Sequence, residues 1–121
     1  MSRKILIADD DPGIVDVTKI ILEQAGFEVL TAPNVSTTIS LLKKHRPNLL
    51  LLDIWLAGEN GAHLAIAQKK DQETKKIPII LVSANNDVEK MARETGADDF
   101  IAKPFDIDHL EQMVYKHIGR K

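Results

Sequence analysis

Short apolar runs alternate along the chain with longer stretches in which apolar residues recur at helical spacing. The short runs cover residues 4–8, 27–31, 49–52, 77–82 and 100–102. The longer stretches lie at about residues 12–25, 35–46, 62–71, 88–95 and 107–118. A period of three to four residues indicates a helix, and a compact apolar run bounded by polar residues indicates a strand. The pattern therefore predicts five strand–helix units.

The type of sheet follows from the strands at 4–8, 49–52 and 77–82. These strands are apolar on both faces, whereas apolar and polar residues alternate in a strand with one face in solvent. Strands of this kind are typical of a parallel sheet that helices cover on both sides. Crossovers between parallel strands are right-handed, which distributes the helices over the two faces. We therefore predict an α/β fold, a three-layer α/β/α sandwich with a five-stranded, parallel, doubly wound sheet, and a single domain over residues 1–121.

Composition narrows the class of protein. The chain has 121 residues, of which 44% are hydrophobic and 28% charged, as in a globular domain. Sixteen basic residues against eighteen acidic ones give a net charge of −2, so no basic excess favours nucleic acid or a membrane surface. The absence of cysteine excludes disulfides, thiolate metal sites and thiol catalysis. With no signal peptide or membrane span in the sequence, we expect a cytoplasmic protein that binds neither membranes nor nucleic acid directly.

Polar side chains follow four of the five predicted strands. Asp9 and Asp10 come after the first strand, Asp53 after the third, Ser83 after the fourth and Lys103 after the fifth. Because the carboxyl ends of parallel strands share one edge of the sheet, where ligands bind, these groups should meet. The sequence thus predicts three carboxylates, a hydroxyl and an ammonium at one edge.

Each of these residues alone has an ordinary structural explanation, as a cap, a turn or a surface charge. Together they bring like charges close, which raises the free energy of the fold unless something offsets the repulsion. A divalent cation such as Mg²⁺, which prefers oxygen ligands, would do so. Asp53 would then be either a metal ligand or a nucleophile toward a phosphoryl donor, with Lys103 and Ser83 contacting the phosphoryl oxygens.

The segments 5–11, 50–61, 79–84 and 100–105 resemble those of the receiver domains of two-component response regulators, in order and at the expected spacing. The resemblance implies a flavodoxin-like fold with strand order 2-1-3-4-5. It implies that Asp53 is the phosphoacceptor, that Asp10 binds the metal directly and that Asp9 binds it mainly through water. The Trp55 carbonyl would be a further ligand of Mg²⁺, with Mn²⁺ as an alternative.

The same resemblance assigns roles outside the metal site. Ser83 is similar to the family's switch hydroxyl, and Phe100 to the aromatic residue that changes rotamer with it. Lys103 is similar to the lysine that contacts the phosphoryl group, and its peptide bond to Pro104 would be cis. The chain has Ala57 where the family often has proline. This difference affects the expected rigidity of the loop after Asp53 and not the expected chemistry.

We therefore expect a phosphorylatable signalling switch. A partner sensor histidine kinase or histidine phosphotransferase would transfer a phosphoryl group to Asp53, and slow hydrolysis would follow. The conformational change would reach the face formed by the helix at 88–95, the strand at 100–102 and the helix at 107–118. The chain would catalyse its own phosphorylation and dephosphorylation without a separate turnover activity, and would signal to a downstream target protein or to an output domain outside this sequence.

Three other functions are weighed against this one. An aspartyl phosphatase typically has a second acid two residues after the nucleophile, where this chain has Trp55. A flavin carrier needs a phosphate-binding loop after the first strand, where three consecutive carboxylates stand. A passive receiver-like interaction module would not need the full set of edge residues. Whether the chain is stand-alone or cut from a longer regulator stays open.

Overall fold

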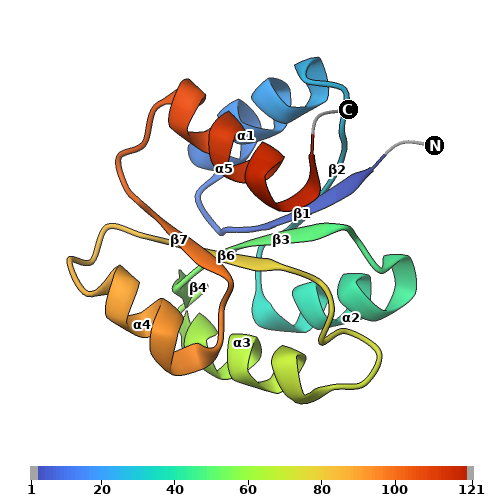
Figure 1. The fold of residues 1–121 in the computed structure, drawn as a ribbon, viewed down its shortest axis with the longest axis vertical. Helices are drawn as coiled ribbons and strands as arrows, with labels where there is room; N and C mark the ends of the chain where they lie inside the picture. The colour runs from blue at the N-terminus through green and yellow to red at the C-terminus, as the bar shows by residue number, and fades with distance from the viewer. Residues whose placement is uncertain (1–2, 120–121) are drawn as a thin grey trace.

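A computed structural model describes residues 3–119, and a five-stranded parallel sheet forms its centre (Figure 1). The strand order is β2-β1-β3-β6-β7, which confirms the predicted order 2-1-3-4-5, since β6 and β7 are the fourth and fifth strands of this sheet. The sheet strands are β1 (Lys4–Ala8), β2 (Glu28–Ala32), β3 (Leu49–Asp53), β6 (Ile79–Ser83) and β7 (Asp99–Ala102).

Five helices cover the two faces of the sheet. They are α1 (Pro12–Gln24), α2 (Val35–His45), α3 (Gly61–Lys70), α4 (Val88–Thr95) and α5 (Ile107–Ile118). Helices α1 and α5 lie on one face, and α2, α3 and α4 lie on the other (Figure 1). This confirms the predicted three-layer sandwich. Within residues 3–119, no helix has the length and apolarity that crossing a membrane requires.

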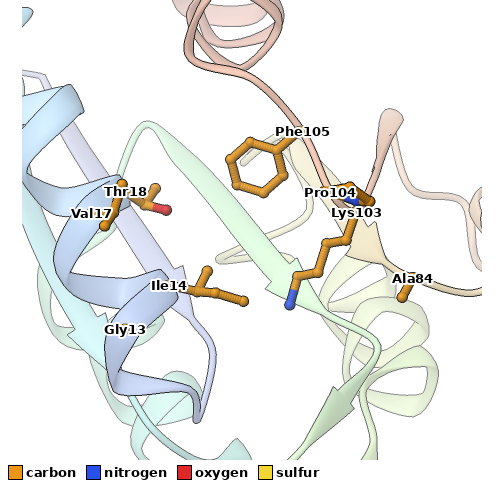
Figure 2. Close-up of a pocket in the computed structure, with 8 residues that line it drawn as sticks. All are labelled: Gly13, Ile14, Val17, Thr18, Ala84, Lys103, Pro104 and Phe105. Atoms are coloured by element: carbon orange, nitrogen blue, oxygen red, sulfur yellow. The ribbon is translucent and has the colours of Figure 1, made fainter.

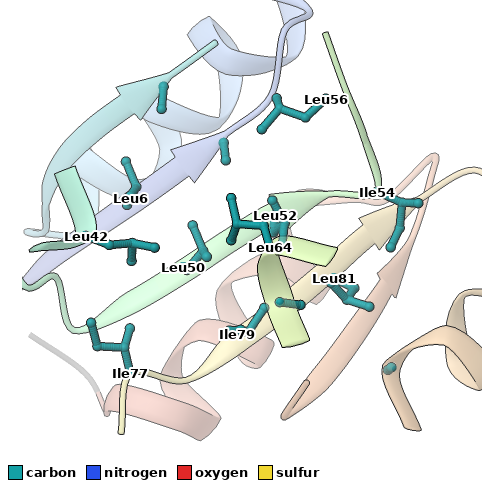
Figure 3. Close-up of a cluster of buried hydrophobic side chains, with 14 of the residues drawn as sticks. Leu6, Leu42, Leu50, Leu52, Ile54, Leu56, Leu64, Ile77, Ile79 and Leu81 are labelled. Atoms are coloured by element: carbon teal, nitrogen blue, oxygen red, sulfur yellow. The ribbon is translucent and has the colours of Figure 1, made fainter. Parts of the chain in front are cut away.

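The two hydrophobic clusters explain why the central strands are apolar on both faces. Alternate residues of one strand point to opposite sides of a sheet. In β3, Leu50 and Leu52 enter the cluster under α2, α3 and α4 (Figure 3), whereas Leu49 and Leu51 enter the cluster under α1 and α5. All four side chains are buried, so a polar residue at any of them would disrupt one of the two clusters.

Helix α1 begins where the sequence predicts. Asp11 is the N-cap of α1, and its carboxylate accepts hydrogen bonds from the backbone N–H groups of Gly13 (2.9 Å) and Ile14 (3.4 Å). Pro12 occupies the first helical position, where its missing N–H costs no helical hydrogen bond. This cap turns the chain sharply after β1 and leaves Asp9 and Asp10 at the end of the strand.

Two details differ from the prediction. The fourth sheet strand begins at Ile79 and not at residue 77, because Pro78 has no N–H for the ladder; its carbonyl still accepts from the Leu50 N–H at 3.0 Å. A small antiparallel hairpin, β4 (Trp55–Leu56) and β5 (Glu59–Asn60), was not predicted.

The hairpin explains why alanine fits at position 57, where the family often has proline. Its two turn residues, Ala57 and Gly58, have φ values of 51° and 82°. A tight two-residue hairpin of this kind requires positive φ at both positions. Proline fixes φ near −65°, so it does not fit this turn conformation, whereas alanine adopts it at a modest energetic cost.

Candidate acidic site at the sheet edge

Four strands deliver the predicted residues to one edge of the sheet. Asp9 follows β1, and Asp53 ends the neighbouring strand β3. Ser83 ends β6, and its carbonyl accepts a hydrogen bond from the Lys103 N–H at 2.9 Å, which extends the pairing of β6 with β7. The parallel topology therefore brings these side chains together from positions almost a hundred residues apart.

Three carboxylates form the centre of the site. One oxygen from each of Asp9, Asp10 and Asp53 lies within 4.8 Å of the others. Asp9 is buried and accepts from the Asp11 N–H at 2.9 Å, whereas Asp10 is exposed and accepts from the Ala57 N–H at 3.2 Å. Clustered carboxylate oxygens are the donors that a hard divalent cation prefers, so the residues present fit Mg²⁺.

Lys103 lies between two of the carboxylates. Its Nζ is 3.1 Å from Asp9 Oδ2 and 3.3 Å from Asp53 Oδ2, and only 15% of its side chain is exposed. The chain's own ammonium therefore offsets part of the repulsion among the carboxylates, which the sequence pattern alone assigns to a cation bound from solution.

The same arrangement shifts two pKa values. Burial raises the pKa of Asp53 above its ordinary value, and the Asp9 charge adds to this, while Lys103 and the Trp55 N–H oppose it. Burial lowers the pKa of Lys103, but the two carboxylates outweigh burial and raise it overall. Asp53 therefore gains basicity compared with a solvated aspartate, while Lys103 remains charged at neutral pH.

The remaining predicted residues surround this centre. Ser83 is buried, and its Oγ accepts from the Asn85 N–H at 3.0 Å. Phe100 is half-buried in β7 and packs against the cluster under α2, α3 and α4. Trp55 is 57% exposed, and the Lys103–Pro104 peptide bond is cis. Among the described residues, no contact joins the Ser83 hydroxyl to the Asp53 carboxylate or to the Lys103 ammonium, although the Ser83 carbonyl accepts from the Lys103 N–H.

An apolar pocket that the sequence does not predict lies next to Lys103. It has a volume of about 440 Å³ and lies between α1 and the loop after β7 (Figure 2). Its lining residues are Gly13, Ile14, Val17, Thr18, Ala84, Lys103, Pro104 and Phe105. The residues come from three segments that are distant in the sequence, so no local pattern indicates the pocket.

Comparison with known proteins identifies the family. Residues 5–115 match the family model described as the response regulator receiver domain. The chain belongs to this family. The receiver domain is 38% identical over 107 residues to the phosphate regulon transcriptional regulatory protein PhoB of Pseudomonas aeruginosa. The aligned region covers 87% of this chain and 47% of that protein. It thus spans about half the length of the curated relatives it matches.

Solved structures give the same result for the fold. The receiver domain superimposes on a response regulator structure from Chloroflexus aurantiacus with a TM-score of 0.92 and 28% identity, covering 99% of this chain and 100% of that one. A sensor histidine kinase receiver domain from Pseudomonas aeruginosa, described with a magnesium ion in its active site cleft, has a TM-score of 0.88. At 23% identity, over 98% of this chain and 99% of that one, it supports the fold alone.

The first prediction tests the crowding of the carboxylates. Without metal, Asp10→Asn should raise the free energy of unfolding by about 0.5 kcal/mol, because it removes a like charge near a partly solvated cluster while an amide oxygen still accepts from Ala57. The same change should weaken Mg²⁺ binding about tenfold. Urea unfolding in EDTA and a magnesium titration measure the two effects, with exposed Asp16→Asn as the control. A destabilised Asp10→Asn protein would contradict the prediction.

Proposed function

We propose that this receiver domain is a phosphoacceptor switch in a two-component phosphorelay, with Asp53 as the phosphoacceptor. The observation that carries the proposal is the Asp53 carboxylate, half-buried at the end of β3, 3.3 Å from Lys103 Nζ and grouped with Asp9 and Asp10. Three carboxylates are gathered here beside the half-buried Lys103 ammonium, an arrangement suited to binding a metal ion together with a phosphoryl group.

Magnesium would be held by Asp9, Asp10 and Asp53, with the Trp55 carbonyl as a further ligand. The geometry of the three carboxylates supports this assignment. The Pseudomonas receiver domain of the same fold is described with a magnesium ion in its active site cleft. When bound, the ion neutralises charge on the phosphoryl oxygens.

The chain's own residues then perform the transfer. An oxygen of Asp53 attacks the phosphorus atom while the bond from phosphorus to the donor breaks, which leaves an acyl phosphate on Asp53. Lys103 binds a phosphoryl oxygen, and the Ser83 hydroxyl donates to another. The donor is a phosphorylated histidine of a sensor kinase or phosphotransferase, and slow hydrolysis restores the carboxylate. The signal passes to a downstream target protein or an output domain.

The direct test is incubation of the chain with acetyl phosphate and Mg²⁺, followed by intact mass and peptide mapping. We expect one labile phosphoryl group per chain, located on Asp53 and absent when EDTA replaces the metal. A label on any other residue, or an unlabelled chain in the presence of excess donor and magnesium, would overturn the proposal.

The output of the switch should appear on the face formed by α4, β7 and α5. Ser83 ends β6, and Phe100 lies in β7, which pairs with β6 through the register Leu81 with Phe100 and Ser83 with Ala102. A hydroxyl drawn toward the phosphoryl group would free space next to these paired strands. Amide shifts on phosphorylation should therefore cluster in α4, β7 and α5. Shifts confined to α1 and α2 would contradict this prediction.

Trp55 should protect the acyl phosphate. Its backbone N–H lowers the pKa of Asp53 and its indole is largely exposed, so we expect a large ring at the solvent side of the site. Such a ring hinders the aligned approach of water to phosphorus. Trp55→Ala should shorten the lifetime of phosphorylated Asp53 about threefold. Decay is measured after removal of the donor, with exposed Ile39→Ala as control, and equal lifetimes in Trp55→Ala and the parent would refute the effect.

A further inference from the structure

The apolar pocket between α1 and the loop after β7, which we call the α1 pocket, adjoins the reacting groups. Lys103 lines it and also contacts Asp53 Oδ2 and Asp9 Oδ2. Ile14 on α1 and the Lys103 side chain point toward one another across it (Figure 2). A group bound at Lys103 therefore has open, apolar space directly beside it.

A second, narrower cavity shares lining residues with the α1 pocket and also touches two of the carboxylates. Its volume is about 20 Å³, and it is lined by Asp9 and Asp53 as well as by Ile14, Thr18 and Phe105, which also line the larger pocket. A phosphoryl group placed between Lys103 and Asp53 must direct its other substituent away from the attacking carboxylate. Lys103 contacts Asp53 and lines the α1 pocket, so a substituent directed past Lys103 would meet that pocket.

We propose that the α1 pocket binds the apolar acyl group of small acyl phosphates, so that Asp53 takes its phosphoryl group preferentially from donors larger than acetyl phosphate. The inference rests on the proposed phosphorylation of Asp53 and names the class of small-molecule donor. In the step, the bond from Asp53 oxygen to phosphorus forms while the bond from phosphorus to the acyl oxygen breaks. The carboxylate leaves as an anion, so no proton or redox partner is needed.

The size of the pocket selects the acyl group. A cavity of roughly 150 Å³ accommodates benzene, so a pocket of about 440 Å³ has ample room for a phenyl ring. The methyl group of acetyl phosphate leaves most of it filled with water. Burying the additional apolar surface of a benzoyl group should favour that donor by about tenfold at subsaturating concentration.

The experiment compares the rates at which Asp53 is labelled by benzoyl phosphate and by acetyl phosphate at equal concentration with Mg²⁺. The ratio of the two rates is measured in the parent, in Val17→Asp and in Ile20→Asp. Val17 and Ile20 are similarly exposed on α1, at 57% and 55%, but only Val17 lines the pocket. Because each ratio contains the same two donors, differences in their intrinsic reactivity cancel between proteins.

We expect the ratio to fall about tenfold in Val17→Asp and to stay at the parent value in Ile20→Asp. Equal ratios in all three proteins would overturn the inference while leaving phosphorylation of Asp53 intact. Binding of benzylphosphonate, which cannot transfer its phosphoryl group, provides a readout independent of labelling. Amide shifts at Gly13, Ile14 and Phe105 that exceed those with methylphosphonate support the pocket even if neither donor labels Asp53, and equal shifts with both compounds would refute it.

Discussion

Asp53→Asn is expected to abolish phosphorylation of this receiver domain by acetyl phosphate. The amide has no anionic oxygen to attack phosphorus, and it cannot form an acyl phosphate. Asp9 is the other carboxylate in contact with Lys103, but it is only 5% exposed and its Oδ1 is occupied by the Asp11 N–H. We therefore expect no substitute nucleophile, and a loss of labelling that is complete within detection.

The measurement is the intact mass of the variant after incubation with donor and Mg²⁺, beside the parent. Exposed Asp87→Asn is the control, because it makes the same chemical change at an aspartate whose side chain makes no capping hydrogen bond to α4. It should be labelled as fast as the parent. Stoichiometric labelling of Asp53→Asn at the parental rate would remove Asp53 from its proposed role, wherever the label is found.

Much of the fold is predictable here because burial dictates the sequence pattern. Leu49 to Leu52 alternate between two clusters, so a fully apolar run is the direct consequence of covering both faces of the sheet. The edge residues follow from topology, since Asp9, Asp53 and Ser83 each stand where a parallel strand ends. Their proximity can be predicted without knowing their side-chain conformations.

Other features depend on information that no local pattern carries. The hairpin of β4 and β5 has strands of two residues, which are too short to show a period, and its turn depends on the φ of Ala57. The contact of Lys103 with both Asp9 and Asp53 depends on where a long, flexible side chain settles. The α1 pocket arises between surfaces whose residues are ordinary in their own segments.

Lys103→Met should have the largest effect on stability among the substitutions considered. Without metal at neutral pH, we expect the free energy of unfolding to fall by about 2 kcal/mol, because two largely buried carboxylates lose their shared cation. Methionine keeps much of the aliphatic volume, so packing changes little. Exposed Lys90→Met, on α4, is the control and should lie within about 0.5 kcal/mol of the parent.

The pH dependence separates this electrostatic cause from a packing defect. Burial and Asp9 already raise the pKa of Asp53, and loss of Lys103 removes an opposing influence, so this pKa should rise further. Between the ordinary aspartate pKa and the raised value, the folded chain binds more protons than the unfolded chain, and stability falls as pH rises. The loss of unfolding free energy in Lys103→Met should therefore be small below the ordinary aspartate pKa and reach its full size above the raised pKa of Asp53.

Magnesium should restore more stability to the variant than to the parent, because it replaces the lost positive charge. A deficit that is constant with pH and unchanged by magnesium would mean that Lys103 stabilises the fold through packing alone.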